Sequence, residues 1–241
     1  MNAYEATLDL LSREVLVNLE AKRLRLGPRP EACADVLRAL GLEGVINYID
    51  TFNPSAGAPY HNAQHEAAVV TLVYEAGLYH NLGRRELRAL VVAAAMHDFD
   101  HSAGALPDSK NIEAAVEGLY LLHTAVAFTS SAITDSETAL AEQLIRVTQY
   151  PYISGTNDLL EDIMRDADLM MPMLADPLRA DLFKGLAREM QATKSFTKQE
   201  FADGIIDFFK KVVWHSTWAV EKAATQGWPH HLESLHAVLG H

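Results

Sequence analysis

Two histidines stand four residues apart where a Pro-rich loop meets an apolar-periodic segment. They are His61 and His65, in the stretch Tyr60-His61-Asn62-Ala63-Gln64-His65. Residues i and i+4 share one face of a helix. The two imidazoles can therefore point into one cavity, either both on a metal ion or one on metal and one on substrate. Ordinary capping or core roles would explain the pair equally well.

A second polar cluster directly follows a strongly apolar segment. The stretch Leu87–Met96 leads into His97, Asp98, Asp100 and His101. Polar groups beside a core are destabilising by several kcal/mol unless they find partners, and a cation would supply them. Adjacent nitrogen and oxygen donors at a helix end can bind one ion, and the carboxylate can bridge to a second. The cluster therefore predicts a metal site.

An acidic pair lies inside a third apolar-periodic segment, Leu159–Met171. One of its two acids, Asp166 and Asp168, must face nearer the core than the other. Asp168 is flanked by Ala167 and Leu169, which favours it as the last metal ligand. Taken alone, an acidic residue here would more often belong to a solvated helix face.

Helices are expected to position all of these residues. Apolar residues recur at helical spacing in nearly every segment, and no convincing period-two alternation appears. We predict an all-α fold, a compact bundle of about nine or ten helices. Breaks between helices are short, so a single catalytic domain is expected over residues 1–241. Residues 1–59 would form an N-terminal helical subregion, packed on the catalytic core or forming a homodimer contact.

Composition limits the partners. The chain has 20 Lys and Arg against 32 Asp and Glu, a formal net charge of -12, which repels nucleic-acid polymers and anionic membranes. A small anionic substrate is compatible, because a bound divalent ion can reverse the local field. Cys33 is the only cysteine, so any metal must be held by histidines and carboxylates. A secretory signal is lacking and the longest apolar stretch is too short for a bilayer, which favours a cytoplasmic location.

The motifs resemble those of a known superfamily. His97-Asp98 with Asp168 far downstream is similar to the signature of the HD superfamily of metal-dependent phosphohydrolases. One branch fits best, the class I cyclic-nucleotide phosphodiesterases, whose YHNxxH and HDxDH motifs resemble Tyr60–His65 and His97–His101. The chain also carries elements similar to their NxE and ADL motifs, at Asn111-Ile112-Glu113 and Ala167-Asp168-Leu169.

The resemblance implies a role for each matched residue. The first of two divalent ions (Zn, Mn, Fe or Mg) would be held by His65, His97, Asp98 and Asp168, with Asp98 shared with the second. His61 would be the general acid, kept protonated by a carboxylate such as Glu113. Around the second ion the resemblance places Asp100, His101, Glu113 and Thr148. Substrate contacts are expected from Tyr60, Ile205 and Phe208.

The chemistry that follows is hydrolysis of a phosphoester. Two cations lower the pKa of a bridging water to about 7, and the resulting hydroxide would attack phosphorus while His61 protonates the leaving group. The leading prediction is a two-metal phosphodiesterase that converts a 3',5'-cyclic nucleotide to the 5'-nucleotide. The alternatives are an HD-type phosphomonoesterase or nucleotidase acting on another small phosphate, and a metal-binding sensor without catalysis.

The chain departs from the family where the base is recognised. The family reads its purine with a Gln and stacks an aromatic side chain on it. Ala202 stands at the Gln position and Ile205 at the aromatic one, and Met170-Met171-Pro172 replaces an Asn after the ADL element. The hydrolytic machinery is therefore better supported than the identity of the base.

Overall fold

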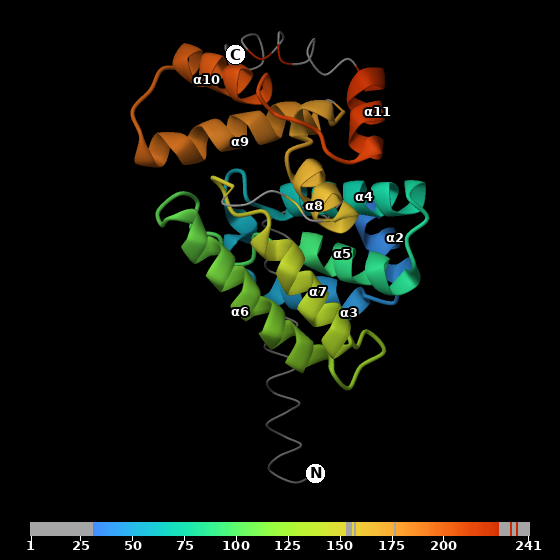
Figure 1. The fold of residues 1–241 in the computed structure, drawn as a ribbon. Helices are drawn as coiled ribbons and strands as arrows, with labels where there is room; N and C mark the ends of the chain where they lie inside the picture. The colour runs from blue at the N-terminus through green and yellow to red at the C-terminus, as the bar shows by residue number, and fades with distance from the viewer. Residues whose placement is uncertain are drawn as a thin grey trace, which may run out of the picture.

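The computed structural model describes residues 31–152, 156, 158–175, 177–226, 232 and 235, and every regular element in them is helical (Figure 1). The prediction of an all-α fold is confirmed. The α-helices are α2 (Glu31–Ala39), α3 (Glu43–Phe52), α4 (Ala63–Tyr79), α5 (Arg84–Met96), α6 (Asp108–Val126), α7 (Asp135–Arg146), α8 (Leu159–Asp168), α9 (Leu178–Thr193), α10 (Lys198–Phe209) and α11 (Thr217–Gln226), with 3-10 turns at Pro54–Gly57 and Met171–Met173.

Helix α5 runs through the centre of the larger layer. Its residues from Ala89 to Met96 are all buried, because apolar side chains surround the helix on every side. It packs against α4 and α7, and α4 in turn packs against α2 and α8. Glycine and alanine allow close approach here: Gly77 on α4 faces the side chain of Leu87 on α5. The helix therefore ends, at His97, inside the protein.

Residues 31–57 of the expected N-terminal subregion lie against this layer. Helix α2 packs on α4, and α3 packs on α5 and α6. Residues 1–30 lie outside the described residues, and the single-domain organisation stays a prediction. No helix among the described residues combines the length and the apolar character that a membrane span requires.

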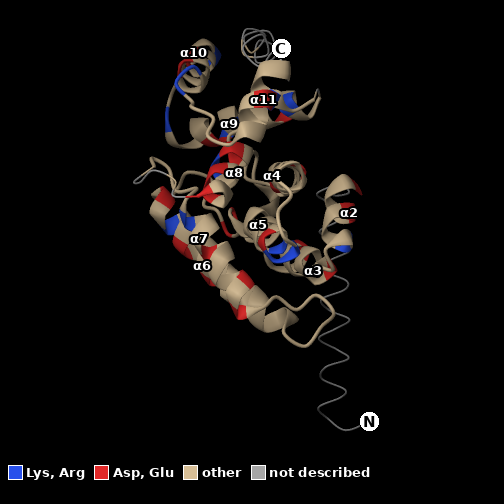
Figure 2. Ribbon diagram, turned by 45° about the vertical axis from the view of Figure 1, so that its right-hand side comes forward, with Lys and Arg blue, Asp and Glu red and all other residues tan. Residues whose placement is uncertain are grey.

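A second layer consists of α9 and α10, which lie above the larger layer in Figure 1, with α8 between the two. Helix α11 lies beside them in this view but packs on α4 and α8, and its buried residues belong to the core of the larger layer. A separate apolar cluster forms its core, with members from α9, α10 and the loop before α4, among them Phe183, Phe201, Phe209 and Tyr60. Figure 2 shows acidic positions along α8, at the seam of the two layers. The seam is where the predicted site residues meet.

Candidate functional site

Helix ends deliver the predicted metal ligands. His65 lies in the first turn of α4, whose N-cap residue Asn62 accepts hydrogen bonds from the Gln64 and His65 amides. His97 caps the C-terminus of α5, with Asp98 directly after it, and Asp168 is the last residue of α8. Three segments far apart in the sequence therefore end at one place.

The donor atoms of these four residues face one another. His65 Nε2 lies 3.4 Å from His97 Nε2, 3.3 Å from Asp98 Oδ2 and 3.2 Å from Asp168 Oδ1. His97 Nε2 lies 3.1 Å from Asp98 Oδ2 and 3.4 Å from Asp168 Oδ1. Neighbouring donors around an ion with metal–ligand distances of 2.0–2.2 Å are about 3 Å apart, so this group could hold a metal ion.

The charges of the cluster favour a bound cation. Burial lowers the pKa of His65, but Asp168 and Asp98 outweigh it and raise the pKa to about 9. The same opposition raises the pKa of His97. Burial raises the pKa of Asp98, but the facing histidines lower it well below its ordinary value. Asp98 Oδ2 nevertheless has no well-formed hydrogen bond among the described residues, and a metal ion would satisfy it.

The turn that carries Asp98 is held from behind by α3. Asn53, at the C-terminus of α3, accepts through Oδ1 from the Asp100 amide (3.0 Å) and from Ser55 Oγ (2.7 Å). The single hydroxyl hydrogen of Ser55 is shared with the Asp98 carbonyl, which lies 2.9 Å from Oγ. Asp100 has a φ of 59°, a left-handed conformation that Asp tolerates better than most residues. Its side chain is exposed, so Asp100 shapes the turn through its backbone.

A buried glutamate binds the predicted general acid. Glu189 Oε2 lies 2.7 Å from His61 Nδ1, and Glu189 Oε1 accepts from the backbone amides of Tyr60 (2.6 Å) and His61 (3.0 Å). Burial raises the pKa of Glu189, but these hydrogen bonds lower it below its ordinary value. Nε2 of His61 takes no part in these contacts, and a His61 ring nitrogen lies within 4.8 Å of donor atoms of Asp98 and His101.

The expectation that Glu113 supports His61 is wrong. Glu113 is exposed and pairs with Lys110 at 2.6 Å, because residues two positions apart on a helix face different directions. Asn111 takes the inward position on α6 instead. It lies 2.9 Å from His101 Nε2 and accepts from the Ser102 amide.

Of the other residues expected around the second ion, His101 lies against His61, whereas Thr148 bonds elsewhere. The His101 ring stacks on the His61 ring with centroids 3.5 Å apart, and burial together with His61 lowers the pKa of His101 to about 4. Thr148 donates to the Ile145 carbonyl at 2.8 Å, and no described contact joins it to the cluster. The more buried acid of the α8 pair is Asp166, whose carboxylate accepts from Ser216 and His215.

A sequence signal for Glu189 did exist. On α9, Leu182, Leu186 and Glu189 share one face at helical spacing, so the glutamate interrupts an apolar stripe. The side chain of Glu189 is 4% exposed. An acidic residue on the buried face of an amphipathic helix must find a partner, but its sequence position does not identify the partner as His61.

Comparisons with known proteins place the fold. No protein-family model matches the chain, and no curated protein matches it by sequence. The crystal structure of the phosphodiesterase domain of Salpingoeca rosetta rhodopsin phosphodiesterase is similar, with a TM-score of 0.61 and 16% identity over 86% of this chain and 85% of that one. A second structure of the phosphodiesterase domain of that choanoflagellate's RhoPDE fusion protein gives a TM-score of 0.59 and 15% identity, over 95% and 90%.

The chain has a phosphodiesterase-like fold. The resemblance expected from the motifs is thereby confirmed for the fold. At these identities the likeness carries no information on substrate or metal.

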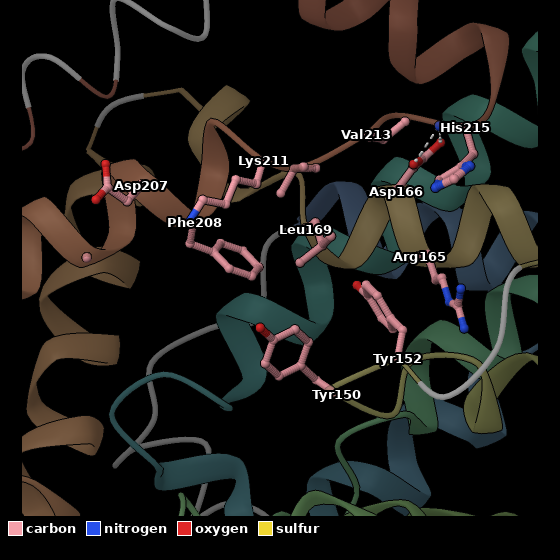
Figure 3. Close-up of a pocket in the computed structure, with 12 residues that line it drawn as sticks. Tyr150, Tyr152, Arg165, Asp166, Leu169, Asp207, Phe208, Lys211, Val213 and His215 are labelled. Atoms are coloured by element: carbon pink, nitrogen blue, oxygen red, sulfur yellow. Dashed lines mark hydrogen bonds between the residues drawn. The ribbon is translucent and has the colours of Figure 1, made fainter.

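Two cavities of the phosphodiesterase-like fold are lined by Gly204 and Phe208 of α10. One, of about 510 Å³, is lined by Tyr150, Tyr152, Leu169, Phe208 and Lys211 among others, and we call it the tyrosine cavity (Figure 3). The other, of about 530 Å³, shares Tyr150, Gly204 and Phe208 with it and is otherwise almost wholly apolar. We call this second space the apolar cavity. Its distinct lining includes Leu186, Met190, Phe196, Phe201 and Ile205.

The predicted substrate contacts divide between these spaces. Phe208 lines both cavities, and Ile205 lines only the apolar one. Tyr60 is buried, with its ring centroid 4.6 Å from that of His65 and 4.7 Å from that of His61. Tyr60 therefore packs beside the two histidines, and its hydroxyl pKa is raised by burial and by Asp168.

Gly185 brings α9 close enough for Glu189 to reach His61. It lies one turn before Glu189, and a Cβ at Gly185 would stand 2.0 Å from the Pro59 carbonyl oxygen. Gly185→Ala is therefore expected to push α9 from the loop, to cost about 1–3 kcal/mol of unfolding free energy and to lengthen the Glu189–His61 contact. Thermal unfolding and a crystal structure of the variant would measure both effects.

Gly77→Ala is the matched control for this change. Its Cβ would meet Leu87 Cδ1 at 2.4 Å, far along α4 from the histidines, so it should destabilise the protein and leave the Glu189–His61 distance unchanged. An unaltered distance in Gly185→Ala would contradict the prediction.

Proposed function

We propose that the protein is a two-metal phosphohydrolase that converts a 3',5'-cyclic nucleotide to the 5'-nucleotide. One observation carries the proposal. The donor atoms of His65, His97, Asp98 and Asp168 converge at separations of 3.1–3.4 Å, with His61 beside them. This arrangement occurs in a fold that is similar to phosphodiesterase domains.

The donor set suits divalent metal ions. Two imidazole nitrogens and two carboxylates are compatible with Zn, Mn, Fe or Mg, and a cation would satisfy Asp98 Oδ2, which has no well-formed hydrogen bond among the described residues. His65, His97, Asp98 and Asp168 would hold the first ion, and Asp98 would also contact the second. When bound, the ions supply Lewis-acid activation of water and neutralise charge on the phosphoryl group.

His61 and Glu189 would provide the proton for the leaving group. Glu189 fixes the His61 ring by binding Nδ1, and the same carboxylate binds the amide of His61, so Nε2 is aimed at the cluster. A phosphoester oxygen that departs as an alkoxide needs a proton, and His61 Nε2 would donate it. His101, stacked on His61, excludes water from one face of the ring. Because the buried Glu189 holds His61 in one orientation, less conformational freedom is lost on reaching the transition state.

A panel of phosphoesters tests the proposal. We expect the purified protein with Mn²⁺, Mg²⁺ or Zn²⁺ to hydrolyse at least one 3',5'-cyclic nucleotide, with the 5'-monophosphate as product, measured by chromatography of the reaction mixture. The absence of turnover of every cyclic phosphodiester would refute the phosphodiesterase assignment.

A second candidate is a phosphomonoesterase. The observation that favours it is Ala202, which is 1% exposed and stands where the resemblance expects a purine-reading Gln. Release of inorganic phosphate from nucleoside monophosphates, with cyclic nucleotides untouched, would support this candidate in the same panel.

A further inference from the structure

The tyrosine cavity is lined in part by α8, the helix that ends at Asp168. Leu169, which lines it, directly follows Asp168, and Arg165 lies one turn earlier on the same helix. Burial, and after it the charge of Asp168, raises the pKa of the Tyr152 hydroxyl. A group attached to a phosphate at the cluster therefore has this cavity beside it.

Two aromatic side chains of this cavity are partly exposed to solvent. Tyr150 is 52% exposed and Tyr152 is 36% exposed. The Tyr150 ring lies 5.7 Å from the Tyr152 ring and 5.8 Å from the Phe208 ring, edge to face in both cases, and Figure 3 shows the three rings around one space with Leu169. Stacking of a base on such a ring typically strengthens binding about tenfold to a hundredfold.

The position of Tyr152 is fixed by a buried arginine. Arg165 is 6% exposed, its Nε donates to the Val147 carbonyl at 2.6 Å, and its guanidinium lies 4.2 Å from the centre of the Tyr152 ring. It forms no ion pair with a carboxylate among the described residues. Its charge is thus available beside the ring that it holds, and a preorganised ring loses little freedom when a ligand stacks on it.

Polar groups distinguish the two cavities. The edge of a nucleobase carries several donors and acceptors, and burying them without partners is costly. The tyrosine cavity offers the Tyr152 hydroxyl, Lys211 and Asp207. The distinct lining of the apolar cavity offers one polar side chain, Glu200, whose carboxylate already binds Thr197 in a capping box. A base would therefore be poorly solvated in the apolar cavity.

We propose that the tyrosine cavity binds the base of the substrate, a planar heteroaromatic group attached to the phosphoester, between Tyr150, Tyr152 and Phe208. The inference rests on the proposed function for the position of the phosphate. It assigns substrate contact to Phe208, and it leaves Ile205, on the apolar cavity, without one.

Paired variants test this assignment through binding. The measurement is calorimetric titration of the full chain, in the presence of Mn²⁺, with a nucleoside 5'-monophosphate and with ribose 5-phosphate, which lacks the base. Tyr152→Leu is expected to weaken binding of the nucleoside monophosphate about tenfold or more and to leave ribose 5-phosphate unchanged. Tyr152→Phe retains the ring and should retain most of the affinity. Phe196→Leu, the matched change in the apolar cavity, should alter neither ligand's affinity by more than about threefold.

Several results would overturn the assignment. They are a loss with Phe196→Leu instead of Tyr152→Leu, an equal loss for both ligands in Tyr152→Leu, and no binding of the nucleoside monophosphate to the unchanged protein. The failure of the proposed function looks different. Base-dependent binding that is sensitive to Tyr152, without hydrolysis of any phosphoester, would retain the cavity and refute the enzyme, whereas hydrolysis that is insensitive to Tyr152 would do the reverse.

Discussion

His61→Ala is expected to lower kcat by about two to four orders of magnitude, the usual contribution of a positioned general acid. His61 is the side chain that Glu189 holds by Nδ1 at 2.7 Å, and a nitrogen of its ring lies within 4.8 Å of donor atoms of Asp98 and His101. The alanine variant keeps all four predicted ligands of the first ion. Steady-state kinetics on the best substrate of the panel, with metal content measured in parallel, would show a large fall in kcat without loss of the first ion.

Two further variants test whether the fall in kcat comes from the Glu189–His61 pair. Glu189→Gln should lower kcat less than His61→Ala, and in the His61→Ala background it should have almost no additional effect, because the two residues act as one unit. His123→Ala is the control, since His123, near the C-terminal end of α6, contacts Thr138 and Asp135 on α7. Unchanged function in His61→Ala would instead favour the metal-binding sensor without catalysis.

The second large effect is a steep rise of metal affinity with pH. In the ion-free protein the pKa of His65 is raised to about 9 and that of His97 is also raised, so both carry protons near neutral pH. A metal ligand must be deprotonated, so binding releases these protons. The apparent association constant should rise about tenfold per pH unit for each histidine proton released, and so up to about a hundredfold while both histidines are protonated. Titrations with Zn²⁺ or Mn²⁺ at several pH values would measure the slope.

The same pKa shifts make the stability of the ion-free protein depend on pH. A raised histidine pKa contributes stability that is fully present below about pH 6.5 and is lost as the pH rises through about 9. The lowered pKa values of Asp98 and Asp168 contribute stability that is present above about pH 4 and is lost in stronger acid. Chelation should therefore abolish turnover and destabilise the protein most on the alkaline side. A metal affinity that does not change between pH 6 and 8, about the range of an ordinary histidine, would contradict this account of the cluster.

Part of this molecule could be predicted from the sequence. The helical period is strong in nearly every segment, so the fold class followed from local pattern. His65, His97, Asp98 and Asp168 carry motif spacings, and the structure brings their donor atoms together. That they bind ions stays a prediction.

What the sequence did not predict depends on packing between distant elements. Glu189 meets His61 only because Gly185 lets α9 approach the Pro59 carbonyl, and no local pattern encodes that approach. The prediction that Glu113 supports His61 was wrong because a motif position does not specify which way a side chain faces on its helix. Tyr152 was missed because its ring meets Arg165 of α8 only through the fold of the segment that follows α7.

The hydrogen bonds of Asn53 and Ser55 show that residues before the first motif support the candidate site. The first recognisable motif begins at Tyr60, yet the turn bearing Asp98 is braced by side chains upstream of it. A chain shortened to start at that motif would keep every chemical group of the site and lose the backing that holds one of them still. The smallest unit that keeps the proposed site intact is thus longer than its motif residues suggest, because Asn53 and Ser55 support the turn that carries Asp98.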